Sequence, residues 1–316
     1  MSVNQTDAGY LAAQNQVSSR AHGGTGRKLR ERAIEFVLFL CALSSVAITL
    51  GIVWVLLYES WHFFANVSLI DFLTDTQWTV LFENPHYGIM PLVTGTLVTS
   101  GIALLVALPL GTTIAIYLSE YAGVNAREVL KPILELLSAV PTVVFGYFAL
   151  LFITPLLQSL LPNLPGFNML SAGIVIGIMI IPYVSSLSED AIRAVPVHIR
   201  EGSYAMGATR LQTSLRVLVP AAFSGIASAY VLGFSRAVGE TMVVALAAGT
   251  QPNLTLNPLE GAATITAYIV QVSLGDLPHG SVAYQSIFAA GLTLMCITLI
   301  FNIGGYLLRK RYREIY

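Results

Sequence analysis

Two opposite charges lie within an apolar stretch that is long enough to cross a membrane. Arg236 and Glu240 are four residues apart in the segment 221–249, AAFSGIASAYVLGFSRAVGETMVVALAAG. On a continuous helix, this spacing places both side chains on one face and within reach of each other. An arginine at mid-membrane costs about 2.5–3.5 kcal/mol on insertion scales, so a chain that keeps one there is expected to use it.

Two interpretations of this pair remain open. In one, the pair is neutralised and locks neighbouring helices together. In the other, it lines a polar passage, where Arg236 would bind an anion through forked hydrogen bonds and Glu240 would hold the guanidinium in place. Ser235 and Thr241 would add hydroxyl contacts to the same passage.

A second unusual stretch is the polar run 196–220, PVHIREGSYAMGATRLQTSLRVLVP, between two apolar segments. Pro196 suits a first helical turn and Gly207 gives a place to bend, so the run predicts two short helices with a turn at the glycine. An ordinary solvated loop is the alternative. The charged side chains of the run are Arg200, Glu201, Arg210 and Arg216.

The composition places the whole chain in a membrane. Of its 316 residues, 55% are hydrophobic and only 10% are charged, whereas soluble domains carry roughly 25% charged residues. The formal net charge of -1 gives no reason to expect nucleic-acid binding. Cys41 and Cys296 lie inside apolar runs, so we expect free core thiols, with neither a disulfide nor a metal site.

The hydropathy pattern predicts an all-α, polytopic bundle of six transmembrane helices. A spanning helix needs about 20 apolar residues. The stretch 263–275 is too short, and we expect a helix on, or dipping into, the outer surface. The six segments that qualify are 34–58, 91–118, 132–158, 169–187, 221–249 and 284–308.

Lysine and arginine positions set the predicted orientation. With six spans, all of the sixteen basic residues except Arg236 fall on one side, which predicts a multi-pass protein of the plasma membrane with both termini in the cytoplasm. We expect a disordered cytoplasmic tail over 1–30, the first span and an outer loop over 31–90, and a core over 91–312. An aromatic belt is expected at the outer end of the first span, from Trp54, Tyr58, Trp61, Phe63 and Phe64.

The polar run resembles the signature loop of bacterial ABC importer permeases, which reads E-A-A, three residues, G, nine residues, I-x-L-P. Glu201, Gly207 and Pro220 match this spacing outright. The resemblance implies a type I (MetI-like) permease whose loop docks on a separate ATPase. The mild departures from the family pattern are Gly202, Ser203, Val217 and Val219.

A narrower resemblance, over roughly residues 30–312, is to phosphate-importer permeases of the PstC type. It rests on SRAVGETMVV at 235–244, SAVPTVVFGYFALL at 138–151 and the stretch 266–288. The resemblance implies that inorganic phosphate, delivered by an external binding protein, is transported, and that Arg236 and Glu240 take part. It also implies a second permease subunit and an ATPase dimer on the cytoplasmic face. Another oxyanion, such as sulfate or molybdate, is the alternative substrate.

Other functions fit the sequence less well. The run 23–28, GGTGRK, lacks the GK[ST] ending of a phosphate-binding loop, so we expect no ATPase site and no bound cofactor; the partner ATPase would use the ATP and Mg. All five histidines lie in the tail or in loops, which argues against an intramembrane enzyme. A scaffold or sensor without transport would not need the charged pair or the signature loop.

Overall fold

The computed structural model describes residues 25–80, 82, 84–275 and 277–311. Within these ranges the chain is helical, and the one β-type pairing is an isolated bridge between Trp78 and Tyr87. The all-α prediction is confirmed. The chain divides after Val55 into two compact units, inside helix α2 (Thr25–Asn66). Of the tail expected over 1–30, the part from Thr25 onward is helical, and residues 1–24 lie outside the described part.

In the described residues, five helical segments are long and apolar enough to span a membrane. A sixth is counted if Arg210–Ala221 and Phe223–Val238, which meet at a bend of 74°, form one span. The five segments are α2 from Arg30 to Asn66, α4 (Met90–Ile116) with η1 (Tyr117–Tyr121), α6 (Thr142–Phe148) with η2 (Ala149–Ile153) and α7 (Thr154–Leu160), α8 (Met169–Arg193), and α15 (Val282–Arg311).

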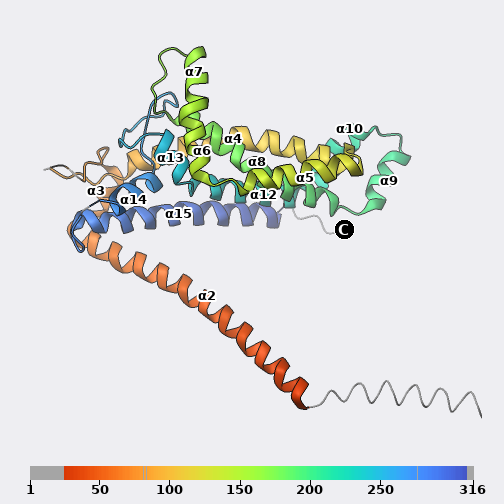
Figure 1. The fold of residues 1–316 in the computed structure, drawn as a ribbon, viewed down its shortest axis with the longest axis horizontal. Coiled ribbons are helices and arrows are strands. Elements are labelled where there is room, and N and C mark those ends of the chain that lie inside the picture. Colours follow the sequence, from red (N-terminus) through yellow and green to blue (C-terminus); the bar gives the residue numbers. More distant parts are fainter. Residues whose placement is uncertain (1–24, 81, 83, 276, 312–316) are drawn as a thin grey trace, which may run out of the picture. The chain divides into compact units, whose positions relative to one another are not determined.

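The predicted span 132–158 is wrong as a single helix. Residues up to Ala139 belong to α5 (Val124–Ala139), and the chain then runs extended through Val140 and Pro141 before α6 begins. Proline lacks an N–H and disfavours the helical conformation of the residue before it, so the helix ends there. Figure 1 shows that α6 and α7 run across the direction of α5 and α8.

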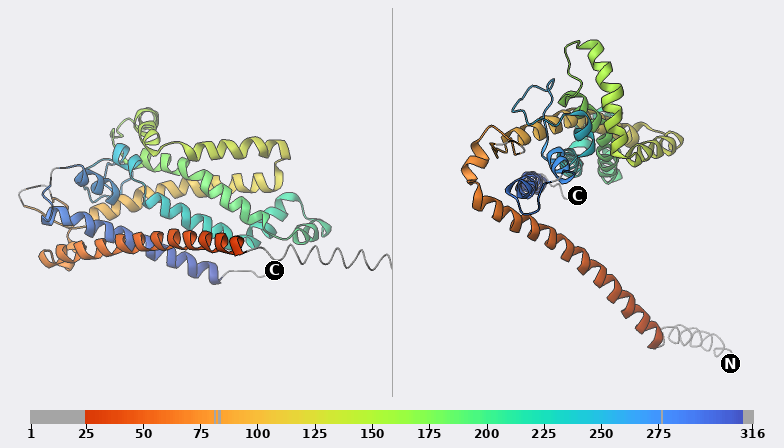
Figure 2. Two further views of the ribbon diagram at one scale, coloured as in Figure 1. Left: turned by 60° about the horizontal axis from the view of Figure 1, so that its bottom comes forward. Right: turned by 60° about the vertical axis from the view of Figure 1, so that its left-hand side comes forward.

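Helix α8 is the centre of the larger unit. It packs against both α4 and α12 (Phe223–Val238), which also contact each other, and Figures 1 and 2 show the three helices running together. Its contact with α4 depends on small residues: a Cβ at Gly173 would lie 2.6 Å from the Cβ of Ile102, and one at Gly177 would lie 2.8 Å from the carbonyl oxygen of Ala103. Glycine therefore allows these two helices to approach closely, as is usual for helices packed in membranes.

The short apolar stretch at 263–275 forms helix α14 (Ile265–Ser273), which is too short to span. Its amide at Ile265 donates to Thr96 Oγ1 of α4 at 3.0 Å. Five of its nine residues are buried, and it packs against α15 and α13 (Met242–Ala247). The stretch is therefore a short helix that the protein itself covers in large part, and its place on, or dipping into, the outer surface stays a prediction.

The aromatic cluster near the end of α2 divides into buried and exposed members. Trp61 is 77% exposed, which fits the predicted belt, but Phe63 is fully buried. Phe63 makes edge-to-face contacts with Phe72 of α3 (Leu69–Thr74) and with Tyr87. Phe63 is therefore a core residue, contrary to the prediction. Both cysteines are free, as predicted, but both are exposed, Cys41 on α2 and Cys296 on α15, so the prediction that they lie in the core is wrong.

Candidate functional site

The segment that carries Arg236 and Glu240 is not one helix. Helix α12 ends at Val238, and α13 begins only at Met242. The prediction that both side chains share one face of a continuous helix is therefore wrong. Gly239 ends α12, and because glycine is unfavourable within a helix, it suits this boundary.

The carboxylate of Glu240 accepts hydrogen bonds within the break between α12 and α13. Its Oε1 accepts hydrogen bonds from the amides of Met242, at 3.1 Å, and Val243, at 3.4 Å. Its carbonyl oxygen accepts one from Thr266 Oγ1 at 2.6 Å. Only 6% of Glu240 is exposed, so these bonds to otherwise unpaired amides at the start of α13 compensate its burial.

Arg236 is exposed and, among the described residues, is not ion-paired. Its guanidinium lies over the ring of Tyr183 of α8, with Cζ 4.8 Å from the ring centroid. The negative face of an aromatic ring attracts a cation and leaves the guanidinium N–H groups free to donate. Arg236 thus keeps a full positive charge that an anion could meet.

The two hydroxyl residues are engaged elsewhere. Ser235 Oγ donates to Asn302 Oδ1 of α15 at 3.3 Å, whereas Arg236 contacts α8. Thr241 Oγ1 donates to the carbonyl oxygen of Gly239 at 3.3 Å. The structure therefore does not gather the four residues around one point, and Arg236 alone among them presents an uncommitted charge.

The run 196–220 folds as the two predicted short helices with a turn at Gly207. Helix α9 (Val197–Ala205) follows Pro196, and Gly207 has φ +82°, a conformation that favours glycine. The return arm is α10 (Arg210–Thr213), η3 (Ser214–Leu218) and α11 (Val219–Ala221). We call residues 197–213 the coupling hairpin, after the ATPase-coupling role expected from the sequence.

The coupling hairpin is held together by its own side chains. Thr209 Oγ1 accepts from the amide of Gln212 at 3.3 Å, and Gln212 Oε1 accepts from the amide of Thr209 at 2.9 Å, which makes a capping box. The hydroxyls of Ser203 and Thr213 lie 2.9 Å apart and join the two arms. Ser203 therefore has an internal structural contact.

The tip of the coupling hairpin is apolar and open. Met206 is 88% exposed, and Leu211 is exposed beyond the turn. Glu201 and Gly202 are exposed on α9, and Pro220 is exposed before the 74° bend. Met206 and Leu211 are thus exposed apolar side chains on an otherwise polar hairpin.

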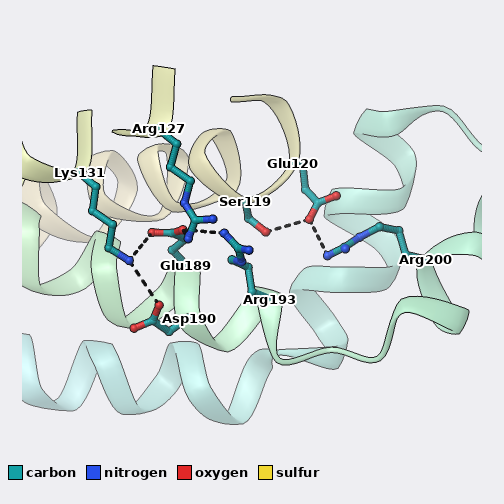
Figure 3. A network of polar contacts seen from close by, with 8 residues as sticks. All are labelled: Ser119, Glu120, Arg127, Lys131, Glu189, Asp190, Arg193 and Arg200. Carbon is teal, nitrogen blue, oxygen red and sulfur yellow. Dashed lines mark hydrogen bonds and ion pairs between the residues drawn. The ribbon is translucent and has the colours of Figure 1, made fainter. Parts of the chain in front are cut away.

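An ion-pair network that the sequence did not reveal lies next to the coupling hairpin (Figure 3). Glu189 of α8 is fully buried, and its carboxylate pairs with Arg127 of α5. Lys131 of α5 and Arg193 of α8 lie 3.5 and 3.7 Å from the same carboxylate. The i, i+4 spacing of Glu189 and Arg193 was visible, but Arg127 and Lys131 reach Glu189 only because α5 packs against α8.

A second ion pair joins the coupling hairpin to the membrane helices. Arg200 of α9 donates from Nη2 to Glu120 Oε1 of η1 at 2.9 Å, and Ser119 donates to the same oxygen at 2.8 Å. The side chain of Glu120 is only 3% exposed. Because η1 continues α4, this pair gives the hairpin a direct link to a membrane-spanning segment.

Residues 107–314 match the family described as the binding-protein-dependent transport system inner membrane component. The probable ABC transporter permease protein YqgH of Bacillus subtilis is 35% identical, over 92% of this chain and 93% of its own. The phosphate transport system permease protein PstC of Mesorhizobium japonicum is 32% identical, over 87% and 86%.

Solved structures share the fold at low identity. A chain of a bacterial ABC transporter involved in the import of the acidic polysaccharide alginate has a TM-score of 0.63 at 17% identity, over 91% of this chain and all of its own. A chain of the MetNI methionine ABC transporter in an inward-facing conformation has a TM-score of 0.53 at 17% identity, over 72% and 95%. From its matching residues and its relatives, the chain belongs to the family of binding-protein-dependent transport system inner membrane components, and it is a membrane permease subunit of an ABC importer.

Proposed function

We propose that this permease imports inorganic phosphate, and that Arg236 meets the anion on its way through the membrane. The observation that carries the proposal is that the two charged side chains have different surroundings. Glu240 accepts hydrogen bonds from the amides of α13, whereas Arg236 is exposed and has no carboxylate partner among the described residues. A guanidinium suits a phosphate because it offers paired N–H donors in a plane. The identity to permeases named PstC supports phosphate as the anion.

The partners follow from the same proposal. An external binding protein would deliver phosphate, and a second permease subunit would complete the passage beside the exposed Arg236. An ATPase dimer on the cytoplasmic face would use ATP and Mg and bind the coupling hairpin at Met206 and Leu211. Both termini would then lie in the cytoplasm of a bacterial cell.

The ion pairs give the coupling hairpin a route to the spans. When the ATPase dimer closes, the hairpin would move as a unit, because its two arms are joined at Ser203 and Thr213. Arg200 would carry that movement to Glu120 and hence to α4. Glu189 would hold α5 to α8, so that the two helices move together. Repacking of these helices would open the passage alternately to the two sides.

The test is uptake of radiolabelled phosphate by cells that express the complete transporter, with sulfate and molybdate as competitors. We expect Arg236→Gln to reduce uptake by at least tenfold while the variant still assembles with the ATPase. Ser235→Ala, next to it, should keep more than half of the uptake, because Ser235 contacts Asn302 instead. Loss of assembly in Arg236→Gln would instead mean that the arginine locks helices together.

The competitor data decide the substrate. Inhibition of uptake by sulfate or molybdate at concentrations equal to phosphate would favour a permease for another oxyanion. This alternative stays open because the name of the relative YqgH gives no substrate, and because a guanidinium by itself does not distinguish tetrahedral oxyanions.

A further inference from the structure

A cationic cavity lies between the start of α12 and the end of α15, away from Arg236 and from the coupling hairpin. It has a volume of about 460 Å³ and is lined by Ser224, Gly225, Ser228, Tyr306, Arg309 and Lys310. Two of these residues are cations, and none is an acid. Neither Arg309 nor Lys310 has a carboxylate within 4.0 Å among the described residues.

Arg309 is held in place across the helix interface. Its Nη1 donates to Ser228 Oγ of α12 at 3.2 Å, and Ser228 in turn donates to the carbonyl oxygen of Ser224 at 2.8 Å. The Nε of Arg309 is buried and has no hydrogen-bond partner in the described part of the chain. A guanidinium has five N–H donors, so one bond to a hydroxyl leaves most of them unused.

The position of the cavity limits what can fill it. Arg309 and Lys310 are in the last turn of α15, directly after its apolar length, and Tyr306 lies one turn before them. Arginine, lysine and tyrosine at the end of a spanning helix lie at the level of the lipid headgroups. Two cations without carboxylate partners, together with hydroxyl groups at headgroup level, are complementary in charge and hydrogen bonding to a phosphate group.

We propose that this cavity binds a phosphate group, with the headgroup of an anionic phospholipid as its source. Arg309 and Lys310 neutralise the phosphate, the hydroxyls of Ser224 and Tyr306 complete its hydrogen bonds, and the acyl chains lie along α15. A lipid bound in this way joins α12 to α15 at the membrane surface. The binding does not depend on which anion the permease transports.

The experiment uses the complete transporter, purified in detergent and examined by native mass spectrometry with added phosphatidylglycerol or phosphatidylcholine. A basic residue near an anionic membrane surface contributes about 1 kcal/mol, which is about fivefold in affinity. We therefore expect the protein to retain phosphatidylglycerol preferentially, and Arg309→Gln to weaken that retention about fivefold. Arg309→Lys keeps the positive charge, so it should weaken phosphatidylglycerol retention less than Arg309→Gln does. That result would show that the site still folds when Arg309 is replaced.

Arg311→Gln is the matched control. It removes the same charge from the same helical turn, but Arg311 does not line the cavity. An equal loss in Arg309→Gln and Arg311→Gln would overturn the proposal, because it would mean a general effect of surface charge.

A second arm separates the two sources of phosphate. Radiolabelled inorganic phosphate is added to the transporter in phosphatidylcholine nanodiscs. Retention that Arg309→Gln abolishes and Arg236→Gln preserves would assign the cavity to the free ion. If the protein retains neither phosphatidylglycerol nor inorganic phosphate above the Arg309→Gln level, the cavity binds no phosphate group.

Discussion

Three buried carboxylates in this protein stabilise three different contacts, and their neighbours determine which contact each one makes. Glu240 satisfies amides at a helix break, Glu189 collects three cations from two helices, and Glu120 holds the coupling hairpin through Arg200. All three are buried. Hydrogen-bond donors offset the cost of burying the charge at Glu240 and Glu120, and three nearby cations offset it at Glu189. Removal of the carboxylate should therefore cost more than its own lost contacts.

Glu189→Gln tests this at the most buried carboxylate. The change keeps the shape but leaves Arg127, Lys131 and Arg193 without their shared partner. The buried glutamine would set an NH2 donor against these cations, so we expect a loss of about 1–3 kcal/mol, the usual cost of an unsatisfied buried group, measured as a lower Tm of the purified transporter. Asp190→Asn is the control, because Asp190 is exposed and lies 3.7 Å from Lys131. Equal Tm values for the two variants would contradict the argument.

The loop that follows helix α3 contains a pH-dependent contact. His86 Nδ1 lies 2.8 Å from Asp75 Oδ2, and this hydrogen bond lowers the pKa of Asp75 below its ordinary value of 3.8. A lowered pKa in the folded state means that the contact stabilises the loop fully above 3.8 and is lost as the pH falls through the lower, folded-state value.

At neutral pH, Asp75→Asn should therefore increase amide hydrogen exchange in the loop from residue 76 to residue 88, because the charged contact is gone. The same increase is expected in the unchanged protein only on strong acidification. Asp71→Asn, an exposed neighbour on α3, is the control and should leave the exchange at pH 7 unchanged. Identical exchange in Asp75→Asn and the unchanged protein at pH 7 would show that the contact does not order the loop.

At the scale of elements, the coupling hairpin depends on one backbone conformation. Gly202 and Gly207 are both exposed, and an added Cβ would meet nothing within 4 Å at either position. They differ in that Gly207 has φ +82°, whereas Gly202 lies within helix α9. The pair therefore separates backbone strain from loss of surface contact.

Gly207→Ala should cost about 1–2 kcal/mol of strain, because L-residues disfavour this conformation. We expect the strained tip to dock poorly, so that ATP hydrolysis by the transporter is no longer matched by uptake. Gly202→Ala should leave the ratio of uptake to hydrolysis unchanged, since alanine is favoured in a helix. If both variants lower this ratio equally, the backbone conformation at Gly207 is not the cause of the lost coupling.

The sequence predicted elements whose signals are local. The apolar runs located most spans, and Gly207 located the hairpin turn. It failed at Gly239, where the break between α12 and α13 involves Glu240 and the distant Thr266. It also failed at Pro141, where a local signal for a break was outweighed by the length of the apolar run. Glu189 was missed because its cations come from α5, which sequence spacing alone does not place beside α8.

At the scale of the whole molecule, the distribution of basic residues predicts which side faces the cytoplasm. By this rule the coupling hairpin and the basic carboxyl end belong on that side, and the segment 250–262 belongs outside. Met206 and Leu256 are both highly exposed and report on the two sides. Cys296 is exposed and free, so it and Cys41 must first be replaced by serine.

In this background, we expect a membrane-impermeant maleimide to label Leu256→Cys in intact spheroplasts. Met206→Cys should be labelled only in inverted vesicles that have been stripped of the ATPase, because the proposed ATPase contact would otherwise cover it. Labelling of Met206→Cys in spheroplasts would reverse the proposed orientation, and with it the side on which the ATPase binds. A variant labelled in neither preparation would be checked after denaturation in detergent.

The bonds that shape the coupling hairpin begin and end within it, at Thr209 with Gln212 and at Ser203 with Thr213. Arg200 reaches beyond it, to Glu120. We therefore expect the coupling hairpin to keep its conformation when it is transferred, together with Glu120, into a related permease. These few residues would then determine which ATPase a permease binds, and a permease could change its ATPase without changes in its membrane-spanning helices.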